Sequence, residues 1–378
     1  MKEKIAYIVS CSDHYGFRLH IVDRYFKEQG YKVVYITSNF DHDKKESFKC
    51  KVEGSVQLQA KSYKKNLSVS RILSHRGFAK SLYKYLCNLE AKPDVLFVHI
   101  PPNYLAKYTA KFKKKYPEVK LIYDIFDLWP ETFPSSKAKK VLAPIFKIWA
   151  GFRDKALKRA DFIISECDLF RQKLSLSDKN SGTVYLCGKK VTVPEADPIL
   201  SQEKLELCYL GSINNIISIP EICSLLSKLI EKKKVVLHIV GMGEMQDEFV
   251  DKAKETGAEV IFYGPIYDDG EKQNILRHCH FGLNVMKQSV CIGLTMKSVE
   301  YFRYGVPIIN NIPADTQKMV NEHDVGVSLD DNCVENILSL TVDDCLKMRD
   351  NVKKVFIDNF TEDKICEKFG YYLNEIIK

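Results

Sequence analysis

Short apolar runs rich in β-branched residues alternate along this chain with longer segments whose apolar residues recur every three or four positions. The first series predicts a strand over residues 4–10, a helix over 18–30 and a second strand over 31–38. A helix that connects two strands in this way is typical of a parallel sheet. Three further apolar runs in this half also predict strands, and they begin the segments 93–102, 120–134 and 160–168.

The same alternation starts again in the second half of the chain. Between the halves, residues 181–204 are rich in Gly, Pro, Lys and Glu and show no periodicity, which predicts a linker. The tail at residues 362–378 predicts a final amphipathic helix. In the second half, strands are expected within residues 205–215, 235–244, 260–266, 281–286 and 306–311, and helices within 219–233, 248–258, 271–279 and 297–305.

Together these segments predict an α/β protein built from two doubly wound parallel sheets. The N-terminal domain is expected over residues 1–190 and the C-terminal domain over 200–358, with a helix at about 360–378 packing back on the N-terminal domain. Ligands of open α/β sheets bind outside the carboxyl ends of the strands. We therefore expect the two sheets to face each other across a ligand-binding cleft.

Composition fits this picture and narrows the function. The 378 residues suit two domains, and 45% of them are hydrophobic, which is enough for two sizeable cores. The 57 basic and 49 acidic residues give a net charge of +8 that is spread along the chain, so it favours anionic ligands only weakly. The basic residues do not cluster with aromatic residues on a recognisable module, so no nucleic-acid partner is expected.

The twelve cysteines have no Cys-x-x-Cys spacing, and several lie inside apolar runs as small buried side chains. This spacing does not favour a zinc site or a redox motif. No cofactor is expected, and the expectation that no metal is needed comes from the family resemblance described below. The N-terminal segment does not resemble a cleavable signal peptide, and no apolar run is long enough to span a bilayer. These features predict a cytoplasmic protein.

Three turns in the second half share one design, in which an apolar strand ends in glycine and a helix follows. They contain Gly211, the pair Gly241 and Gly243, and Gly293. Backbone amides at such turns and at helix N-termini bind anions. A single turn of this kind is usually plain structure, but three along one sheet favour a nucleotide-binding edge.

Residues 289–311 carry the most specific pattern, because Lys297 and Glu300 lie one helical turn apart just after a glycine turn. A lysine at the first turn of a helix can contact a diphosphate as a point charge. A carboxylate on the same face can accept hydrogen bonds from the two hydroxyls of a ribose. The alternative is a surface ion pair between Lys297 and Glu300, which would contribute little.

The stretch Lys-Ser-Val-Glu-Tyr-Phe-Arg-Tyr-Gly-Val-Pro-Ile-Ile at residues 297–309 resembles the donor-binding segment of GT-B-fold glycosyltransferases, most closely glycosyltransferase family 4 of the bacterial capsule and exopolysaccharide type. The segments at residues 123–133, 236–244 and 260–266 are similar to family segments in the same order. The resemblance covers most of the chain, although residues 40–90 carry little of it.

This resemblance implies a set of site residues. Glu300 would hold the donor ribose, Lys297 would face the diphosphate, and Asp127 would face the acceptor or donor sugar. The other donor-binding positions that it implies are Gly16, Tyr263, Gly264, Ile266, Gly293, Leu294 and Thr295. The glycine turns add Gly211, Asn214 and Gly241 as donor-binding candidates. Independently of the resemblance, Asp127 and His14 are candidates for handling the acceptor proton, and the alternative for His14 is a loop histidine without a catalytic role.

The chain departs from the family pattern at two places. Many members carry a glutamate eight residues before the ribose-binding one, where this chain has Ile292, so the contact of that glutamate with the donor sugar is in doubt. Many also carry an arginine and a lysine after the first glycine turn of the second domain, where this chain has Asn214 and Asn215. The diphosphate would then depend more on Lys297 and on backbone amides.

The resemblance implies a retaining, metal-independent transferase that moves a sugar from a nucleotide-diphosphate sugar, with UDP as the expected nucleotide, to a saccharide or lipid-linked acceptor in surface polysaccharide synthesis. Two alternatives stay open: a nucleotide-sugar epimerase of similar fold, and a non-catalytic partner subunit with the same fold. The sequence does not identify the sugar, the acceptor or the oligomeric state.

Residues 137–161 mix large apolar side chains with lysines and arginines, which predicts an amphipathic, basic helix. One interpretation is a peripheral contact with anionic lipid at the inner face of the plasma membrane, which would suit a lipid-linked acceptor. The other is a helix that packs on the core and exposes its basic side to solvent.

Overall fold

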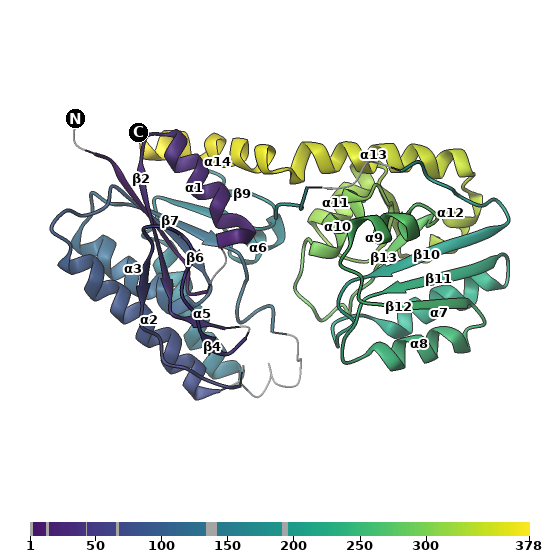
Figure 1. Ribbon diagram of the computed structural model, residues 1–378, viewed down its shortest axis with the longest axis horizontal. Helices are drawn as coiled ribbons and strands as arrows, with labels where there is room; N and C mark the ends of the chain where they lie inside the picture. The colour runs from purple at the N-terminus through teal and green to yellow at the C-terminus, as the bar shows by residue number, and fades with distance from the viewer. Residues whose placement is uncertain (1–2, 13–14, 43, 66–67, 134–141, 191–195) are drawn as a thin grey trace. The chain divides into compact units, whose positions relative to one another are not determined.

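The computed structural model describes the chain except for residues 1–2, 13–14, 43, 66–67, 134–141 and 191–195 (Figure 1). The chain separates into two compact units. The N-terminal unit comprises Met1–Tyr185 and Ile365–Lys378, and the C-terminal unit comprises Leu186–Lys364. The chain therefore passes between the units twice, at residues 185–186 and again at 364–365.

The N-terminal unit contains a parallel sheet in the order β5-β2-β1-β6-β7-β8-β9. Its strands are β1 (Ile5–Val9), β2 (Lys32–Ser38), β5 (Val56–Leu58), β6 (Val95–Ile100), β7 (Lys120–Ile125), β8 (Phe162–Ser165) and β9 (Ser181–Thr183), and β3 (Phe40–Asp41) pairs with β4 (Glu46–Ser47) as a hairpin. Its helices are the π-helix η1 (Tyr15–Leu19), α1 (His20–Glu28), α2 (Val69–Asn88), α3 (Asn103–Lys115), α5 (Ala143–Leu157), α6 (Asp168–Lys173) and α14 (Glu362–Ile377).

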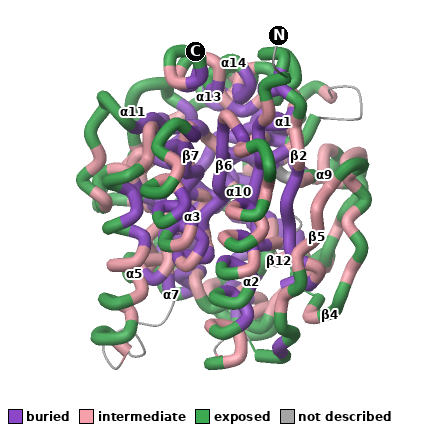
Figure 2. Tube along the Cα trace, turned by 90° about the vertical axis from the view of Figure 1, so that its left-hand side faces the viewer, coloured by how far each residue is buried: buried purple, intermediate pink, exposed green. Residues whose placement is uncertain are grey.

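The centre of this sheet is buried on both faces, as a parallel sheet covered by helices requires. All six residues of β6 are buried, and Figure 2 shows this strand buried along its length. A buried ion pair interrupts the apolar centre. Nη2 of Arg18 lies 3.0 Å from Oδ1 of Asp124 on β7. Burial by itself would raise the pKa of Asp124, but Arg18 and His99 outweigh burial and hold that pKa below its ordinary value.

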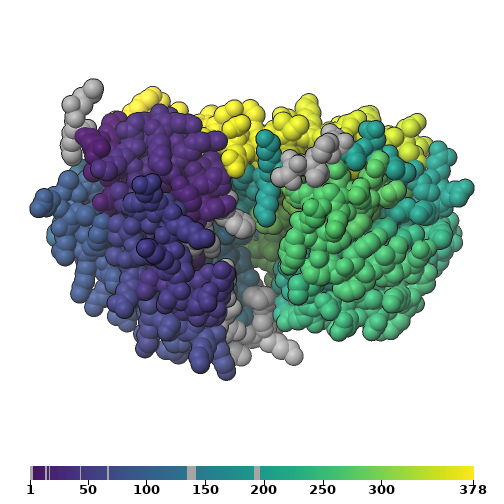
Figure 3. Space-filling model, viewed as in Figure 1, coloured from purple at the N-terminus to yellow at the C-terminus, as the bar shows by residue number. Residues whose placement is uncertain are grey.

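Helix α14 completes the core of the N-terminal unit although it comes last in the chain. The ring of Phe369 is fully buried, lies 6.2 Å from the ring of Phe97 and packs against the guanidinium of Arg18. Near the end of the helix, the hydroxyl of Tyr31 donates a 2.9 Å hydrogen bond to the carbonyl of Ile377. Figure 3 shows this helix, in yellow, against the purple N-terminal segment.

The C-terminal unit contains a parallel sheet in the order β12-β11-β10-β13-β14-β15. Its strands are β10 (Lys204–Leu210), β11 (Lys234–Val240), β12 (Glu259–Gly264), β13 (Phe281–Asn284), β14 (Ile308–Asn310) and β15 (Gly326–Ser328). Its helices are α7 (Ile219–Ile230), α8 (Gln246–Glu255), α9 (Asp269–Leu276), α10 (Met296–Arg303), α11 (Asp315–His323), α12 (Cys333–Ser339) and α13 (Val342–Phe360).

The strand order reverses direction between β10 and β13 in this sheet, and between β1 and β6 in the sheet of the N-terminal unit. Such reversals create a crevice outside the carboxyl ends of the two strands, where open α/β sheets bind their ligands. In the C-terminal unit this point lies at Leu210 and Asn284, the last residues of β10 and β13. Residues at this edge of the sheet are therefore the candidates for a ligand-binding site.

Sequence patterns located the strands well but missed part of the structure. The segment 181–204, predicted as a linker, begins with β9, which pairs with β8 through Ile163 and Ser181. The sequence Ser-Gly-Thr carries no apolar signal, and Gly182 is needed because a Cβ there would lie 2.4 Å from the ring of Tyr372. The long helix α2 was also missed, because its apolar residues are spread around the helix instead of along one face.

We expect Phe369→Ala to lower the free energy of unfolding of the N-terminal unit by about 3–5 kcal/mol, because it removes a fully buried ring. Urea unfolding followed by tryptophan fluorescence measures this change, since Trp129 and Trp149 belong to that unit. The control is Tyr371→Ala in the same helix, where the side chain is 75% exposed and a change below about 0.5 kcal/mol is expected. Equal effects of the two variants would contradict a core role for α14.

Candidate functional site

The ends of β10, β11 and β12 lie side by side at the carboxyl edge of the sheet in the C-terminal unit, at Gly211, Gly241 and Gly264. The amide of Gly211, after β10, donates to the carbonyl of Val240 over 2.9 Å, and the amide of Gly241, after β11, donates to the carbonyl of Gly264 over 2.8 Å. Gly241 has φ +153°, and a Cβ there would lie 1.9 Å from the carbonyl oxygen of Gly211. Glycine at position 241 is therefore required by the neighbouring backbone.

Helix α10 is fastened to this edge by Tyr301. Its buried hydroxyl donates to the carbonyl of Cys208 over 2.9 Å and accepts from the amide of Leu210 over 2.8 Å, both on β10. Its ring covers β13 so closely that a Cβ at Gly282 would lie 2.4 Å from it. Both strands at the reversal point therefore determine where α10 lies.

The N-terminus of α10 is held in place by side-chain hydrogen bonds. Thr295 caps the helix, accepting from the amide of Ser298 over 2.9 Å and lying 3.0 Å from Oδ1 of Asn284 at the end of β13. The carbonyl of Gly293 accepts 3.0 Å and 2.8 Å hydrogen bonds from the amide and the hydroxyl of Thr316, and the side chain of Leu294 is buried. Amides in the first helical turn have no partner within a helix, so this end attracts anions.

Lys297 lies in that first turn and places its ammonium group in an apolar position. Nζ is shielded from solvent, sits 3.6 Å from the centre of the Tyr209 ring and makes no hydrogen bond to any residue that the structure describes. The side chain passes close to Gly211, where a Cβ would lie 3.9 Å from its Cε. Burial lowers the pKa of Lys297 to about 7, and Cys208 opposes the shift. A buried cation without a counter-ion is costly, so the position favours an anionic ligand.

Glu300 lies one turn further along α10 and is held by two cations. Its Oε1 lies 3.3 Å from Nζ of Lys272 on α9 and 3.1 Å from Nη1 of Arg303. Arg303 is fixed in turn by an ion pair with Asp269. Both contacts of the Glu300 carboxylate use Oε1. The alternative of an ion pair between Lys297 and Glu300 is wrong, because Nζ of Lys297 has no hydrogen-bond partner among the described residues and Glu300 pairs with Lys272 and Arg303 instead.

The turn after β10 contains Asn214 and Asn215, where the resemblance implied two basic residues. The side chain of Asn214 accepts a 3.2 Å hydrogen bond from the amide of Ile216 and so stabilises the turn itself. A cation nevertheless reaches this turn from elsewhere, because Nζ of Lys287, just after β13, donates to the carbonyl of Asn215 over 2.6 Å. Ile292, at the position of the absent glutamate, packs against the apolar core of the unit.

The turn after β12 is more open. Gly264 has φ +72° and nothing within 4 Å of a Cβ built on it, so the backbone there is accessible. Tyr263 points back along the sheet, with its hydroxyl 3.0 Å from Nδ1 of His238. Ile266 is partly exposed. These positions offer backbone groups and an exposed aromatic edge at the same rim as Gly211 and Gly241.

The remaining predicted residues belong to the N-terminal unit. Gly16 lies in η1 and is exposed, with nothing within 4 Å of a Cβ built on it, so the fold itself does not require glycine there. Asp127, two residues after β7, accepts a 2.6 Å hydrogen bond from the hydroxyl of Thr132. Burial raises the pKa of Asp127, against the opposing effect of that hydrogen bond. His14 lies outside the described residues.

Three residues at this edge were not found from the sequence: Tyr209, Lys272 and Lys287. Tyr209 contacts Lys297, Lys272 contacts Glu300, and Lys287 contacts Asn215, in each case from another element of the fold. Sequence spacing and local patterns do not reveal contacts of this kind. The tyrosine of β10 looks like an ordinary core residue, and the two lysines belong to polar segments.

Comparison with known proteins agrees with this architecture. Residues 204–341 match the family model of Glycosyl transferases group 1. No curated protein sequence matches the chain.

Solved structures match the chain along nearly its whole length. The apo form of lipopolysaccharide outer core galactosyltransferase WaaB matches over 98% of this chain and 99% of its own, with a TM-score of 0.68 and 14% identity. Anabaena Alr3699/HepE in complex with UDP and glucose matches over 99% and 100%, with a TM-score of 0.62 and 11% identity. Trehalose-6-phosphate from E. coli bound with UDP-2-fluoro glucose matches over 99% of both chains, with a TM-score of 0.64 and 9% identity. These likenesses confirm the predicted fold, two parallel α/β domains of the GT-B type.

We expect Lys297→Met to raise the free energy of unfolding at about pH 7, without ligand, by about 1–3 kcal/mol, because it removes a buried, unpaired ammonium. Between the folded pKa of about 7 and the ordinary value of 10.5, the unfolded parent chain binds more protons than the folded one. The stability of the parent chain therefore rises with pH in this range, and the advantage of the variant shrinks. Urea unfolding at several pH values measures it.

The control for this prediction is Lys232→Met, which changes an exposed lysine just after α7. No stabilisation is expected from that variant. A Lys297→Met chain that is less stable than the parent at every pH would contradict the description of Lys297 as an unsatisfied cation.

Proposed function

We propose that this chain is a glycosyltransferase that transfers a sugar from a UDP-sugar to a saccharide or lipid-linked saccharide acceptor, with retention of configuration at the anomeric carbon. The observation that carries the proposal is the buried ammonium of Lys297, which lies beside Gly211 at the reversal point of the sheet and has no counter-ion among the described residues. A diphosphate supplies the missing negative charge. The match of residues 204–341 to the glycosyltransferase group 1 model supports the same assignment.

The donor would bind along the carboxyl edge of the C-terminal unit. Its diphosphate would lie between Lys297 and the free amides at the N-terminus of α10. Glu300, whose Oε1 is held by Lys272 and Arg303, would accept hydrogen bonds from the ribose hydroxyls through Oε2. The accessible backbone at Gly264 would contact the base. The choice of UDP rests on Alr3699/HepE and the E. coli protein, whose structures contain UDP or a UDP-sugar.

The chemistry of the proposed reaction places negative charge on the leaving diphosphate as the bond to the sugar breaks. Preorganised groups that face this charge stabilise the transition state. Lys297 is suited to this role, because a bound diphosphate would restore the protonated form that burial disfavours. The proposal assigns this role to a lysine and backbone amides and needs no metal ion for it.

The acceptor proton requires a separate group. Asp127 is the candidate on the N-terminal unit, because burial raises the pKa of its carboxyl group toward the range in which a carboxylate accepts protons efficiently. His14 is the second candidate from the sequence.

We expect Lys297→Ala to weaken UDP-sugar binding by about 10- to 100-fold, since a contact with a charged group contributes about 1.5–3 kcal/mol. Glu300→Gln is expected to weaken binding by about 10-fold, because it removes the charge that the ribose hydroxyls contact. Titration calorimetry with a panel of UDP-sugars measures both effects. The experiment also tests for proton uptake, because recharging Lys297 near pH 7 binds a proton and makes the observed heat depend on the buffer.

The controls are Lys232→Ala and Glu231→Ala, two exposed residues just after α7, and both are expected to bind donor like the parent. Normal binding by Lys297→Ala and Glu300→Gln would disprove the proposed donor site. Incubation of the parent chain with donor alone separates the remaining alternatives: a transferase gives at most slow hydrolysis, and an epimerase gives an epimer of the sugar. Failure to bind any nucleotide would indicate a non-catalytic partner.

A lipid-linked acceptor would bring the chain to a membrane surface, and α5 is the element suited to that contact. Residues 137–141 of the predicted amphipathic segment lie outside the described residues, and α5 covers its central part. Within the described residues, no helix combines the length and apolar character needed to cross a bilayer. Any contact proposed here is therefore peripheral.

One side of α5 packs on the loop after β7. Phe146 lies 5.3 Å from Phe133 and Trp149 6.0 Å from Trp129, measured between ring centres. Another side exposes Ile145 and Ile148, with 53% and 63% of their surface accessible, beside exposed lysines. Exposed isoleucines next to lysines are typical of a helix that lies in a membrane interface.

We expect the chain to float with vesicles that contain phosphatidylglycerol and to remain at the bottom of the gradient with vesicles of phosphatidylcholine alone. The double variant Ile145→Ser/Ile148→Ser is expected to lose flotation. Ile357→Ser is the control, because that isoleucine is 56% exposed on α13 of the other unit. Equal recovery of all three chains at the bottom of the gradient would disprove the membrane contact.

A further inference from the structure

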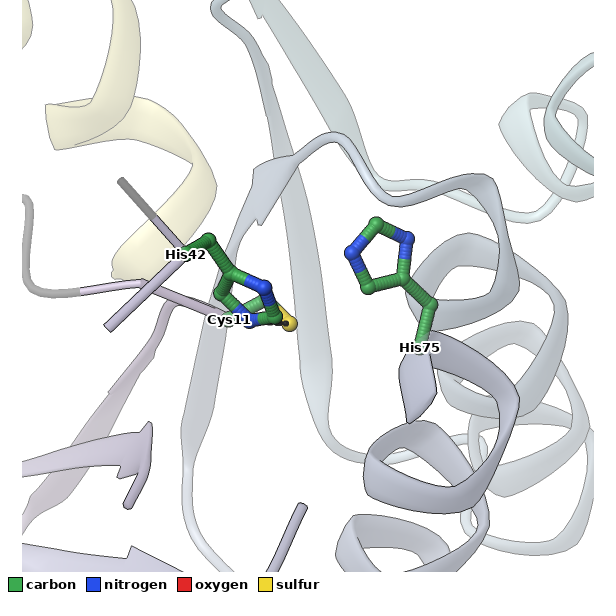
Figure 4. A group of neighbouring side chains, drawn as sticks. All are labelled: Cys11, His42 and His75. Carbon is green, nitrogen blue, oxygen red and sulfur yellow. Dashed lines mark hydrogen bonds between the residues drawn. The ribbon is translucent and has the colours of Figure 1, made fainter. Parts of the chain in front are cut away.

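Three side chains of types that can ligate metals lie together inside the N-terminal unit, and none of them is assigned to the donor or the acceptor above. Cys11 follows the end of β1, His42 lies in the β3–β4 hairpin, and His75 belongs to α2. All three are buried, at 3%, 8% and 6% exposure. Figure 4 shows them side by side, with one ring nitrogen of His75 turned toward the other two side chains.

The distances are close to those of a metal centre. Sγ of Cys11 lies 3.3 Å from Nε2 of His42, and one ligand atom from each of the three residues lies within 4.8 Å of the others. With Zn–S bonds of about 2.3 Å and Zn–N bonds of about 2.0–2.1 Å, the ligand atoms of a tetrahedral site are roughly 3.3–3.6 Å apart. The Cys11–His42 pair already has this spacing, so only the ring of His75 needs to approach, by about 1 Å.

The hydrogen bonds of the two imidazoles prepare them for a metal. Nδ1 of His42 lies 2.7 Å from the hydroxyl of Tyr63, and if Nδ1–H donates there, the lone pair of Nε2 faces Cys11. Metal-bound histidines typically donate their second N–H to such a partner. Nδ1 of His75 is buried and makes no hydrogen bond within the described part of the chain, so that nitrogen does not fix the ring in its present position. The other ring nitrogen is the one turned toward Cys11 and His42 (Figure 4), so it is the atom that would bind the metal.

The charge states of the residues also fit. Neutral imidazoles and a thiolate are the forms that bind zinc, and two histidines and one cysteine supply them here. Burial raises the pKa of the Cys11 thiol, and Arg71 nearby acts in the opposite direction by favouring the thiolate. Arg71 also repels a cation, so we expect weaker binding than at structural zinc sites with several cysteines.

We propose that Cys11, His42 and His75 bind a zinc ion through Sγ and two imidazole nitrogens. On binding, the thiol of Cys11 loses its proton to solvent, the two imidazoles donate lone pairs, and a water molecule takes the fourth position. The ion would join the loop after β1, the β3–β4 hairpin and α2, three segments distant in the sequence. The inference is independent of the proposed transferase activity, because it concerns none of the residues assigned to the donor or the acceptor.

The test uses the full chain, loaded with zinc, dialysed and analysed for metal by mass spectrometry. We expect the parent to retain about one zinc per chain, and Cys11→Ser and His75→Ala to retain none. Tyr63→Phe is expected to lower zinc affinity by about 10-fold, because it removes the hydrogen-bond partner of His42. Cys87→Ser and His323→Ala, which lie outside the cluster, should bind zinc like the parent.

Cobalt provides a second measurement that depends on the identity of the ligands. The cobalt-loaded parent should show a thiolate-to-cobalt charge-transfer band that is absent from Cys11→Ser, and metal should raise the melting temperature of the parent. Circular dichroism checks that each variant is folded. Should Cys11→Ser fail to fold, the zinc affinity of Tyr63→Phe decides the question. A parent chain without zinc after dialysis, or an unchanged affinity in Tyr63→Phe, would overturn the proposal.

Discussion

The position of one ammonium group determines how the C-terminal unit can work. Nζ of Lys297 is withdrawn from water, faces the ring of Tyr209 and has no anionic partner among the described residues. The folded chain tolerates this arrangement because the cation–π contact offsets part of the lost hydration and because the amine can give up its proton near neutral pH. This unpaired ammonium lies at the reversal point of the sheet, and the proposal that a diphosphate binds there rests on that coincidence.

Other residues at the carboxyl edge of this sheet fix the position of helix α10, which carries both Lys297 and Glu300. Tyr301 fastens the middle of α10 to β10, Thr295 fastens its start to β13, and Arg303 fastens its end through Asp269. The two residues proposed to contact the donor therefore move only if the whole helix moves. Lys272 adds a contact from α9, which makes the orientation of the Glu300 carboxylate depend on a second helix. Tyr301, Thr295, Arg303 and Lys272 therefore hold the two side chains that are proposed to contact the donor.

Much of the fold and the centre of the candidate site could be predicted from the sequence, and the reasons are local. Strands β1, β6, β7, β10 and β11 are apolar runs buried on both faces, and Lys297 and Glu300 share one helix, so spacing alone relates them. Strand β9 was missed because Ser-Gly-Thr contains no apolar residue, and helix α2 was missed because its apolar residues do not lie along one face.

The return of the last helix to the N-terminal unit was predicted, but individual side-chain contacts between distant segments were not. Lys287 reaches the turn at Asn215, and Lys272 reaches Glu300, only because the sheet brings their elements together. The cysteine and two histidines of the proposed zinc site come from three separate segments, so the search for closely spaced ligands did not find them. The reason for glycine at position 241 could not be predicted either. The turn suggested an approach of the backbone to an anion, whereas in the structure the carbonyl oxygen of Gly211 lies where a Cβ would be.

The return of α14 to the N-terminal unit has a consequence for how the chain is made. A ribosome releases residues in order, so the C-terminal unit is fully synthesised before Phe369, which fills the centre of the other unit, becomes available. Until then the apolar surface around Phe97 and the guanidinium of Arg18 lack their cover. The N-terminal unit therefore cannot complete its core until the whole chain has been synthesised, and exposed apolar surface of this kind favours aggregation.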